Sequence, residues 1–245
     1  MTKVRSQGSG GILPPKNVGR DAPPPLVVAN PFLPVEIHAN RLPHWQQGET
    51  AQFVTWRLGD SLPCEKLELW KNEKHAWLRV HPEPWDDSRR KEYHQRFSNR
   101  LEEWLDAGEG SCLLRDEVCR KIVTDALHYF DDRRYDLWAF VVMPNHVHVL
   151  FSSRSPHLLQ QVLHSWKSYT AKALNRHLRR GGMVWQEDYW DRLIRSHEHF
   201  RKCVRYIRSN PEKALLTTGE YTLYEKEGSG GILPPYEWGG TPHLP

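Results

Sequence analysis

The sequence predicts an α+β fold, on three observations. Residues 51–58 alternate between apolar and polar types and are rich in β-formers, which is typical of a strand. Two β-rich runs, 135–143 and 146–151, flank the pair Pro144-Asn145, which predicts a β-hairpin. Segments with helical spacing of apolar residues lie on both sides of that hairpin. Strands and helices interleaved in this way predict an α+β sandwich.

The helices follow from apolar spacing and from their end signals. The sequence predicts helices over 64–75, 88–107, 116–130, 155–180 and 196–208. Gly108 is expected to end the second helix. The pair Asn210-Pro211 is expected to stop the last one, because the residue before a proline is biased away from helical geometry.

The chain of 245 residues is expected to hold one folded domain between two flexible ends. Residues 1–43 and 217–245 are rich in proline and glycine and show no sustained period, so the folded body is expected at 44–216. The longest apolar run has seven residues, 137–143, which is far too short to span a membrane. The four cysteines have no zinc spacing. A cytoplasmic protein with reduced thiols is therefore expected.

Positive charge is concentrated in one part of the chain. The net charge is +4, but residues 164–208 carry eleven lysines and arginines against four acidic residues, a local balance of +7. Such a segment is either a solvated helical face or a surface for phosphate backbones. Six tryptophans and tyrosines are interleaved with these charges, and they are either stacking platforms for unpaired bases or core residues.

Two histidines in the second β-run form a candidate metal site. Because side chains alternate along a strand, His146 and His148 point to the same face, about 7 Å apart along the backbone. Two neutral imidazoles on one face can share a metal ion, although many such pairs are ordinary polar-face residues. A third ligand is required.

The last predicted helix offers that ligand and a nucleophile. If it continues to Asn210, then Tyr206 and Asn210 are four residues apart and lie on one face. Laid over the strand with the histidines, that face presents a phenol and a carboxamide together. The alternative is that Tyr206 belongs to the core and Asn210 caps the helix.

Five motifs in order give the chain a family resemblance that extends from about residue 52 to 216. They are Met143-Pro144-Asn145-His146-Val147-His148-Val149-Leu150, Ser165-Trp166-Lys167-Ser168, Val184-Trp185-Gln186, Arg192-Leu193-Ile194-Arg195 and Tyr206-Ile207-Arg208-Ser209-Asn210-Pro211. Together they resemble the HUH-type single-strand DNA transposases (the IS200-like transposases), and most closely the REP-associated tyrosine transposases. One motif alone would carry little weight, whereas the ordered set is specific.

The resemblance implies a ferredoxin-like sandwich with a central antiparallel sheet, and a metal-dependent activity. It implies a divalent cation, magnesium or manganese, on His146, His148 and Asn210. Tyr206 would attack a DNA phosphate and form a 5′-phosphotyrosine, so that single-stranded DNA is cleaved and rejoined at REP-like hairpins. Lys167, Arg192 and Arg195 are assigned to DNA phosphates. Tyr189 and Tyr169 are rival nucleophiles, but neither has an amide four residues later.

Several questions stay open at this stage. The chain departs from small family members in its proline-rich N-terminal extension and in a long insertion between the first strand and the hairpin, so a homodimer and a monomer are both compatible with the sequence. A hairpin-binding protein without catalysis and a replication- or conjugation-type nickase are the alternative functions. The enzyme is expected in the cytoplasm, associated with the nucleoid when bound to DNA.

The octapeptide GSGGILPP occurs twice, at 8–15 and 228–235. One permitted coding of GGILPP is GGCGGCA-TCC-TGCCGCC, whose last seven bases are the reverse complement of the first seven. The hypothesis is that both copies are translated DNA hairpins of the type the enzyme acts on. The alternative is a pair of flexible linkers.

Overall fold

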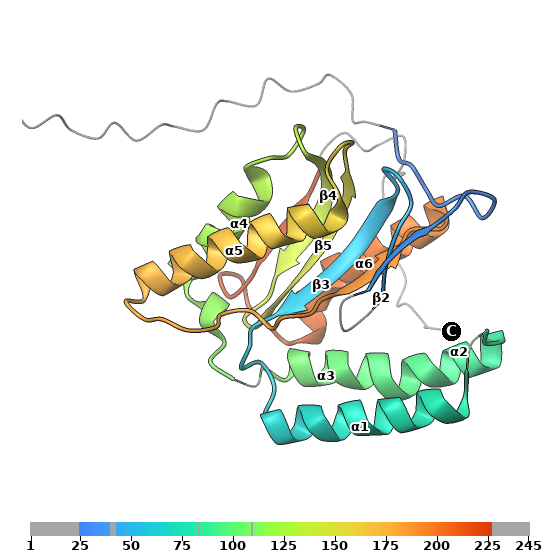
Figure 1. The fold of residues 1–245 in the computed structure, drawn as a ribbon. Helices are drawn as coiled ribbons and strands as arrows, with labels where there is room; N and C mark the ends of the chain where they lie inside the picture. The colour runs from blue at the N-terminus through green and yellow to red at the C-terminus, as the bar shows by residue number, and fades with distance from the viewer. Residues whose placement is uncertain (1–24, 40–42, 83, 109, 227–245) are drawn as a thin grey trace, which may run out of the picture.

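The computed structural model describes residues 25–39, 43–82, 84–108 and 110–226, and its centre is a five-stranded antiparallel sheet (Figure 1). The strand order is β6-β3-β5-β4-β7. These strands are β3 (Ala51–Arg57), β4 (Tyr135–Val142), β5 (His146–Ser153), β6 (Trp190–Leu193) and β7 (Thr222–Glu225). A two-residue turn at Pro144-Asn145 joins β4 to β5, and it is closed by a hydrogen bond from the Met143 amide to the His146 carbonyl. The predicted α+β class and the predicted hairpin are confirmed.

The order of elements around the sheet is that of a ferredoxin-like sandwich. The chain runs β3, α4 (Glu117–His128), β4, β5, α5 (Leu159–His177), β6, and the first and third strands of this set, β3 and β5, are central neighbours. Helices α4 and α5 pack together on one face, whereas α6 (His197–Lys213) covers the other (Figure 1). Strand β7 then extends the sheet beside β4. The predicted ferredoxin-like arrangement is therefore confirmed.

Alternation along β5 divides the interior into two cores. Val147, Val149 and Phe151 face α4 and α5. Leu150 faces the opposite way, into a core with Phe200, Val204 and Ile207 of α6. Because side chains alternate, His146 and His148 share the α6 side with Leu150. The strand that closes the core thus also aims both imidazoles at α6.

A helical hairpin is inserted between β3 and α4, and it forms a third layer (Figure 1). Its helices are α1 (Cys64–Val80), α2 (Asp87–Tyr93) and α3 (Arg100–Asp106), with the π-helical turn His94–Asn99 between α2 and α3. The hairpin has its own aromatic core, built around Trp70, Trp77 and Phe97. The single helix predicted at 88–107 is therefore α2, the π-turn and α3 in one continuous run, followed by the short 3-10 turn Leu113–Arg115 before α4.

The two ends of this insertion touch at Gly110. Its φ is +85°, and a Cβ atom added there would lie 2.2 Å from the carbonyl oxygen of Asp60. The Asp60 carboxylate also accepts a hydrogen bond from the Ser111 amide at 3.2 Å. Only glycine combines this backbone conformation with so close an approach.

Gly110→Ala is expected to lower the free energy of unfolding by about 2–4 kcal/mol. The cost of a left-handed backbone for alanine adds to the cost of the clash between its Cβ atom and the Asp60 carbonyl. Gly182 is the matched control, since its φ is +93° and nothing lies within 4 Å of an added Cβ. Gly182→Ala should cost only about 1 kcal/mol of strain. Urea denaturation of the two variants measures the difference, and equal losses would show that the contact with Asp60 is unimportant.

The structure differs from the sequence prediction at several boundaries. Helix α6 does not stop at Asn210-Pro211 but includes Pro211 and ends at Lys213. Burial of Asn210 and Pro211 against the sheet outweighs the lost amide donor. Strand β7 lies inside the segment predicted as a flexible tail, because pairing with β4 is a long-range contact with no local signal. Strands β1 (Glu36–Ala39) and β2 (Pro43–Gln46) form a two-stranded sheet that includes part of the predicted N-terminal extension.

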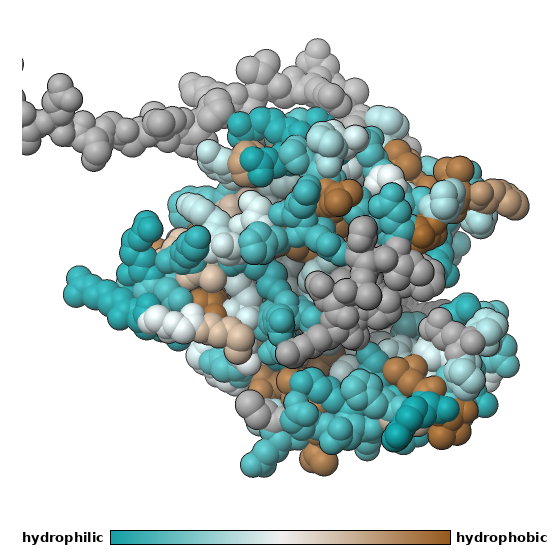
Figure 2. Space-filling view, in the orientation of Figure 1, coloured by the Kyte–Doolittle hydropathy of each residue, from teal (hydrophilic) through white to brown (hydrophobic). Residues whose placement is uncertain are grey.

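Both GSGGILPP copies lie outside the described residues. Among the residues that are described, no helix combines the length and the apolar character that crossing a membrane requires. The face seen in Figure 2 is mostly hydrophilic, and its hydrophobic residues form small separate patches.

Candidate catalytic and metal site

The two histidines converge beneath α6. His146 and His148 are each 1% exposed, and their Nε2 atoms lie 3.0 Å apart. The sheet register fixes this arrangement, because Arg57 pairs with His146 and Thr55 pairs with His148 across the β3–β5 ladder. The face predicted from strand alternation is therefore the face on which the structure places both imidazoles.

A hydrogen bond at Nδ1 leaves Nε2 of His146 as the atom that could ligate a metal ion. His146 Nδ1 lies 2.7 Å from Oδ1 of Asn145, whose own Nδ2 donates to the Leu105 carbonyl at 3.0 Å. An amide oxygen only accepts, so Nδ1 of His146 carries the proton and Nε2 carries a lone pair. His148 Nδ1 lies 2.7 Å from the Thr55 hydroxyl, which can donate or accept. Thr55 therefore supports both neutral tautomers of His148.

Asn210 closes the group from α6. Its Nδ2 lies 3.5 Å from His148 Nε2, and its buried Oδ1 has no hydrogen-bond partner. Rotation of the carboxamide by half a turn exchanges these atoms and directs Oδ1 at the imidazoles. Two imidazole nitrogens and an orphaned amide oxygen are a donor set that fits a divalent cation. Burial lowers the pKa of His146 to about 3 and that of His148 well below its usual value, so both rings are neutral, as metal ligation requires.

Tyr206 lies one helical turn before Asn210, beside the histidines. Its ring centroid is 5.2 Å from that of His148 and 5.7 Å from that of Phe53, with edge-to-face geometry in both pairs. The Lys213 ammonium lies 5.1 Å from the centre of the Tyr206 ring. The structure thus brings together all four residues predicted for nucleophile and metal.

Acidic side chains of the inserted hairpin influence Tyr206. The Glu102 carboxylate of α3 is close enough to raise the pKa of Tyr206, and Asp106 lies one turn further along the same helix. Burial, followed by the charges of Glu102 and Asp106, raises the pKa of Tyr206 well above its usual value of 10. Burial also raises the pKa of Glu102, and burial together with the Glu102 charge raises that of Asp106 to about 6.

The three predicted DNA-contacting residues lie in different places. Arg192 of β6 is close enough to Tyr206 and Glu102 to influence both pKa values, and its side chain is exposed. Arg195 is exposed between β6 and α6. Lys167 lies on α5, across the sheet, where its ammonium donates to the carbonyls of Gln186 and Glu187 at 2.8 and 2.5 Å. The structure therefore gathers Arg192, but not Lys167, around the tyrosine.

The rival tyrosines lie away from the histidines. Tyr189 is buried in the core on the α4–α5 side of the sheet, and Tyr169 is exposed on α5. The sheet separates α5 and this core from α6, so neither tyrosine shares the compartment of His146 and His148.

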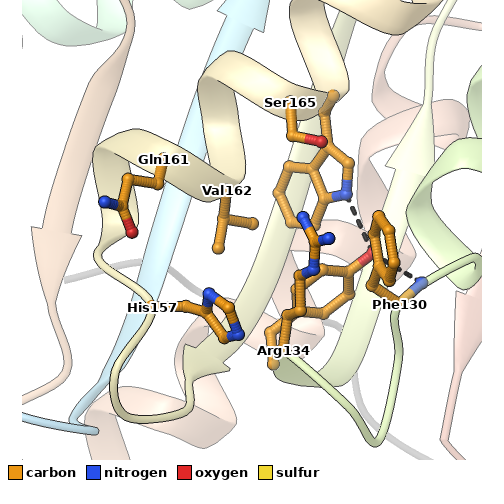
Figure 3. Close-up of a pocket in the computed structure, with 8 residues that line it drawn as sticks. Phe130, Arg134, His157, Gln161, Val162 and Ser165 are labelled. Carbon is orange, nitrogen blue, oxygen red and sulfur yellow. Dashed lines mark hydrogen bonds between the residues drawn. The ribbon is translucent and has the colours of Figure 1, made fainter.

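Two further features lie on the α4–α5 side. Asp116, Cys119 and His177 place potential ligand atoms within 4.8 Å of one another, but Asp116 already caps α4 by accepting from the Cys119 amide. Figure 3 shows a small hollow between α5 and the start of β4, lined by residues that include Arg134, His157 and Gln161. It contains no predicted site residue.

Sequence reasoning missed several members of the site. Thr55 and Asn145, which hold the two imidazoles, are not among the predicted site residues, and neither are Glu102 and Asp106. Asn145 precedes His146 directly, so its contact has a local signal. The α3 carboxylates have none, since about 100 residues separate them from Tyr206.

Comparison with known proteins shows a similarity over the part of the chain that carries the candidate site. Residues 112–210 match the family model described as "Transposase IS200 like". The match covers less than half of the chain, and it shows that this segment is similar to the IS200-like transposases. It contains both histidines, Tyr206 and Asn210, whereas the inserted hairpin lies before it.

A curated protein similar to this chain is a REP-associated tyrosine transposase from Escherichia coli (strain K12). The two are 26% identical over 122 residues, which are 44% of this chain and 66% of the relative, slightly less than two thirds of its length. A solved structure of a REP-associated tyrosine transposase bound to a REP hairpin matches 69% of this chain and 71% of its own, at 16% identity and a TM-score of 0.39. That structural similarity is too low to place individual residues.

Proposed function

We propose that this protein cleaves and rejoins single-stranded DNA at hairpin repeats, through a phosphotyrosine formed on Tyr206. The observation that carries the proposal is the convergence of the buried His146, His148 and Asn210 with the partly buried Tyr206, in a segment similar to the IS200-like transposases. A phenol beside three side chains that can ligate a metal ion provides the nucleophile and the cation site that phosphodiester transfer requires.

The chemistry exchanges one phosphate ester for another. The Tyr206 oxygen forms a bond to phosphorus while the bond from phosphorus to the 3′ oxygen breaks. The phenol loses its proton to solvent, and the departing 3′ oxygen takes one up. The phosphate is then an ester of tyrosine, so a second 3′ hydroxyl can reverse the step and join a different strand without ATP.

The residues around Tyr206 have separate tasks. His146, His148 and Asn210 would hold a divalent cation, magnesium or manganese, which when bound withdraws charge from the phosphate and the leaving oxygen. Asn145 and Thr55 keep the imidazoles oriented. Arg192 and Lys213 put positive charge beside the tyrosine, where the phosphate must sit.

The substrate class follows from charge and from the relatives. The +7 segment at 164–208 includes Arg192 and Arg195 and suits a phosphate backbone. The curated relative is named for association with REP sequences. The two GSGGILPP-coding regions, if their codons can pair, are candidate hairpins within the gene itself.

The test uses single-stranded oligonucleotides copied from those coding regions with their flanks. Incubation with the protein and Mn²⁺ or Mg²⁺ should give a protein–DNA adduct on a denaturing gel, and EDTA should abolish it. A hairpin that binds but is never cut would favour a DNA-binding protein without catalysis. An adduct that never rejoins to a second strand would favour a nickase.

A further inference from the structure

A second group of potential metal ligands lies where the start of α4 meets the end of α5. Asp116 is the N-cap of α4, Cys119 is the third residue of that helix, and His177 is the last residue of α5. The carboxylate oxygen, the thiol sulfur and the imidazole nitrogen of these residues all lie within 4.8 Å of one another. Because the three side chains come from two helices, it is the packing of α4 against α5 that brings them together.

Hydrogen bonding and burial define how an ion would enter this group. The Cys119 amide donates to Oδ1 of Asp116 at 2.9 Å, which orients the carboxylate over the first turn of α4. A carboxylate offers about four lone-pair positions, so the cap leaves most of them for another partner. His177 Nε2 lies 4.0 Å from the same Oδ1 atom. The thiol is fully buried, whereas the carboxylate and the imidazole are exposed, so an ion enters from their side and meets the sulfur last.

We propose that Asp116, Cys119 and His177 bind a zinc ion that joins the start of α4 to the end of α5. The donor set selects the metal, because thiolate and imidazole favour zinc, whereas magnesium and manganese favour oxygen donors. Three protein ligands leave one position of a tetrahedral zinc ion for water. The metal binds the thiolate, so ligation releases the thiol proton to solvent.

This zinc site is separate from the candidate site beneath α6. Helices α4 and α5 lie on one face of the sheet and α6 lies on the other (Figure 1). The zinc ion would therefore act on stability rather than on DNA chemistry, since an ion that binds only the folded chain stabilises it by mass action. The proposal stands whether or not the protein cleaves DNA.

Cobalt is the probe that tests the site, because Co²⁺ replaces zinc in such sites and absorbs in the near ultraviolet when a thiolate binds it. Adding Co²⁺ to the reduced, metal-free protein should produce this charge-transfer band. Zn²⁺ should abolish the band, whereas an excess of Mg²⁺ should not. His148→Ala should keep it, since the site beneath α6 contains no cysteine. If no band develops at saturating Co²⁺, the proposal is wrong.

Variants with matched controls identify the ligands. Cys119→Ala should abolish the band, whereas Cys112→Ala, which removes the half-buried thiol that precedes the same helix, should keep it. His177→Ala should weaken zinc binding by at least about tenfold, whereas His164→Ala, which removes an exposed imidazole from the same helix, should not. Asp116→Asn should also weaken zinc binding, although asparagine caps a helix as well as aspartate does and α4 should stay intact.

Thermal unfolding of the same proteins shows what the ion does. Zn²⁺ should raise the Tm of the parent protein and leave the Tm of Cys119→Ala unchanged. A band that persists in Cys119→Ala, or disappears in Cys112→Ala, would place the thiolate elsewhere and overturn the assignment. If Asp116→Asn and His177→Ala both bind zinc as tightly as the parent protein does, the three residues do not form one site, and the proposal is wrong.

Discussion

Tyr206→Phe is expected to reduce formation of the protein–DNA adduct by at least about 1,000-fold, because the phenylalanine ring has no oxygen to bond to phosphorus. Folding should be preserved, since the ring keeps its edge-to-face contacts with His148 and Phe53. The measurement is the initial rate of adduct formation under saturating Mn²⁺.

Tyr189→Phe and Tyr169→Phe are the matched controls. Tyr169 is exposed and Tyr189 belongs to the opposite core, so neither change should alter the adduct rate by more than about twofold if the fold is intact. If the adduct persists in Tyr206→Phe but is lost in one of the control variants, the tyrosine replaced in that control variant is the nucleophile, and the assignment of Tyr206 is wrong.

His148→Ala is expected to lower cleavage by about 100-fold or more, because the cation contribution to phosphoryl transfer is several kcal/mol. His148 is in contact with His146, Asn210 and Thr55, so the substitution removes the candidate metal ligand that lies between the other two. Titration of Mn²⁺, followed by the paramagnetic resonance of the free ion, should show that the variant also binds Mn²⁺ more weakly than the parent protein does when no DNA is present.

His164→Ala controls for the loss of an imidazole. His164 is exposed on α5, on the other side of the sheet, and the variant should bind Mn²⁺ and cleave as the parent protein does. Equal Mn²⁺ affinity in His148→Ala and the parent protein would show that the cation binds elsewhere, and the group Asp116, Cys119 and His177 would then be the first alternative.

Much of the geometry of the candidate site could be predicted from the sequence because its determinants are local. Strand alternation places His146 and His148 on one face whatever the rest of the chain does. The same holds for Tyr206 and Asn210, whose four-residue spacing puts them on one side of a helix. The Pro144-Asn145 turn fixes where β5 begins, and this determines which face of the sheet both histidine side chains point to.

What could not be predicted depends on contacts between distant segments. Strand β7 is short and lies in the segment predicted as a flexible tail. It forms a strand only because it pairs with β4. The end of α6 was placed too early, because burial of Pro211 outweighs its local cost. The assignment of Lys167 to DNA phosphates stays a prediction; its ammonium donates to two backbone carbonyls, contacts for which the sequence has no signal, and burial lowers its pKa to about 8. The approach of α3 to Tyr206 likewise has no signal in either segment.

The most direct test of the account is to identify the residue that carries the DNA. The adduct formed with a short hairpin oligonucleotide is digested with protease and nuclease, and the modified peptide is sequenced by mass spectrometry. We predict one phosphate-linked nucleotide remnant, on Tyr206, and none when EDTA is present. A remnant on Tyr189, on Tyr169 or on any residue other than Tyr206 would contradict the assignment of the catalytic site beneath α6.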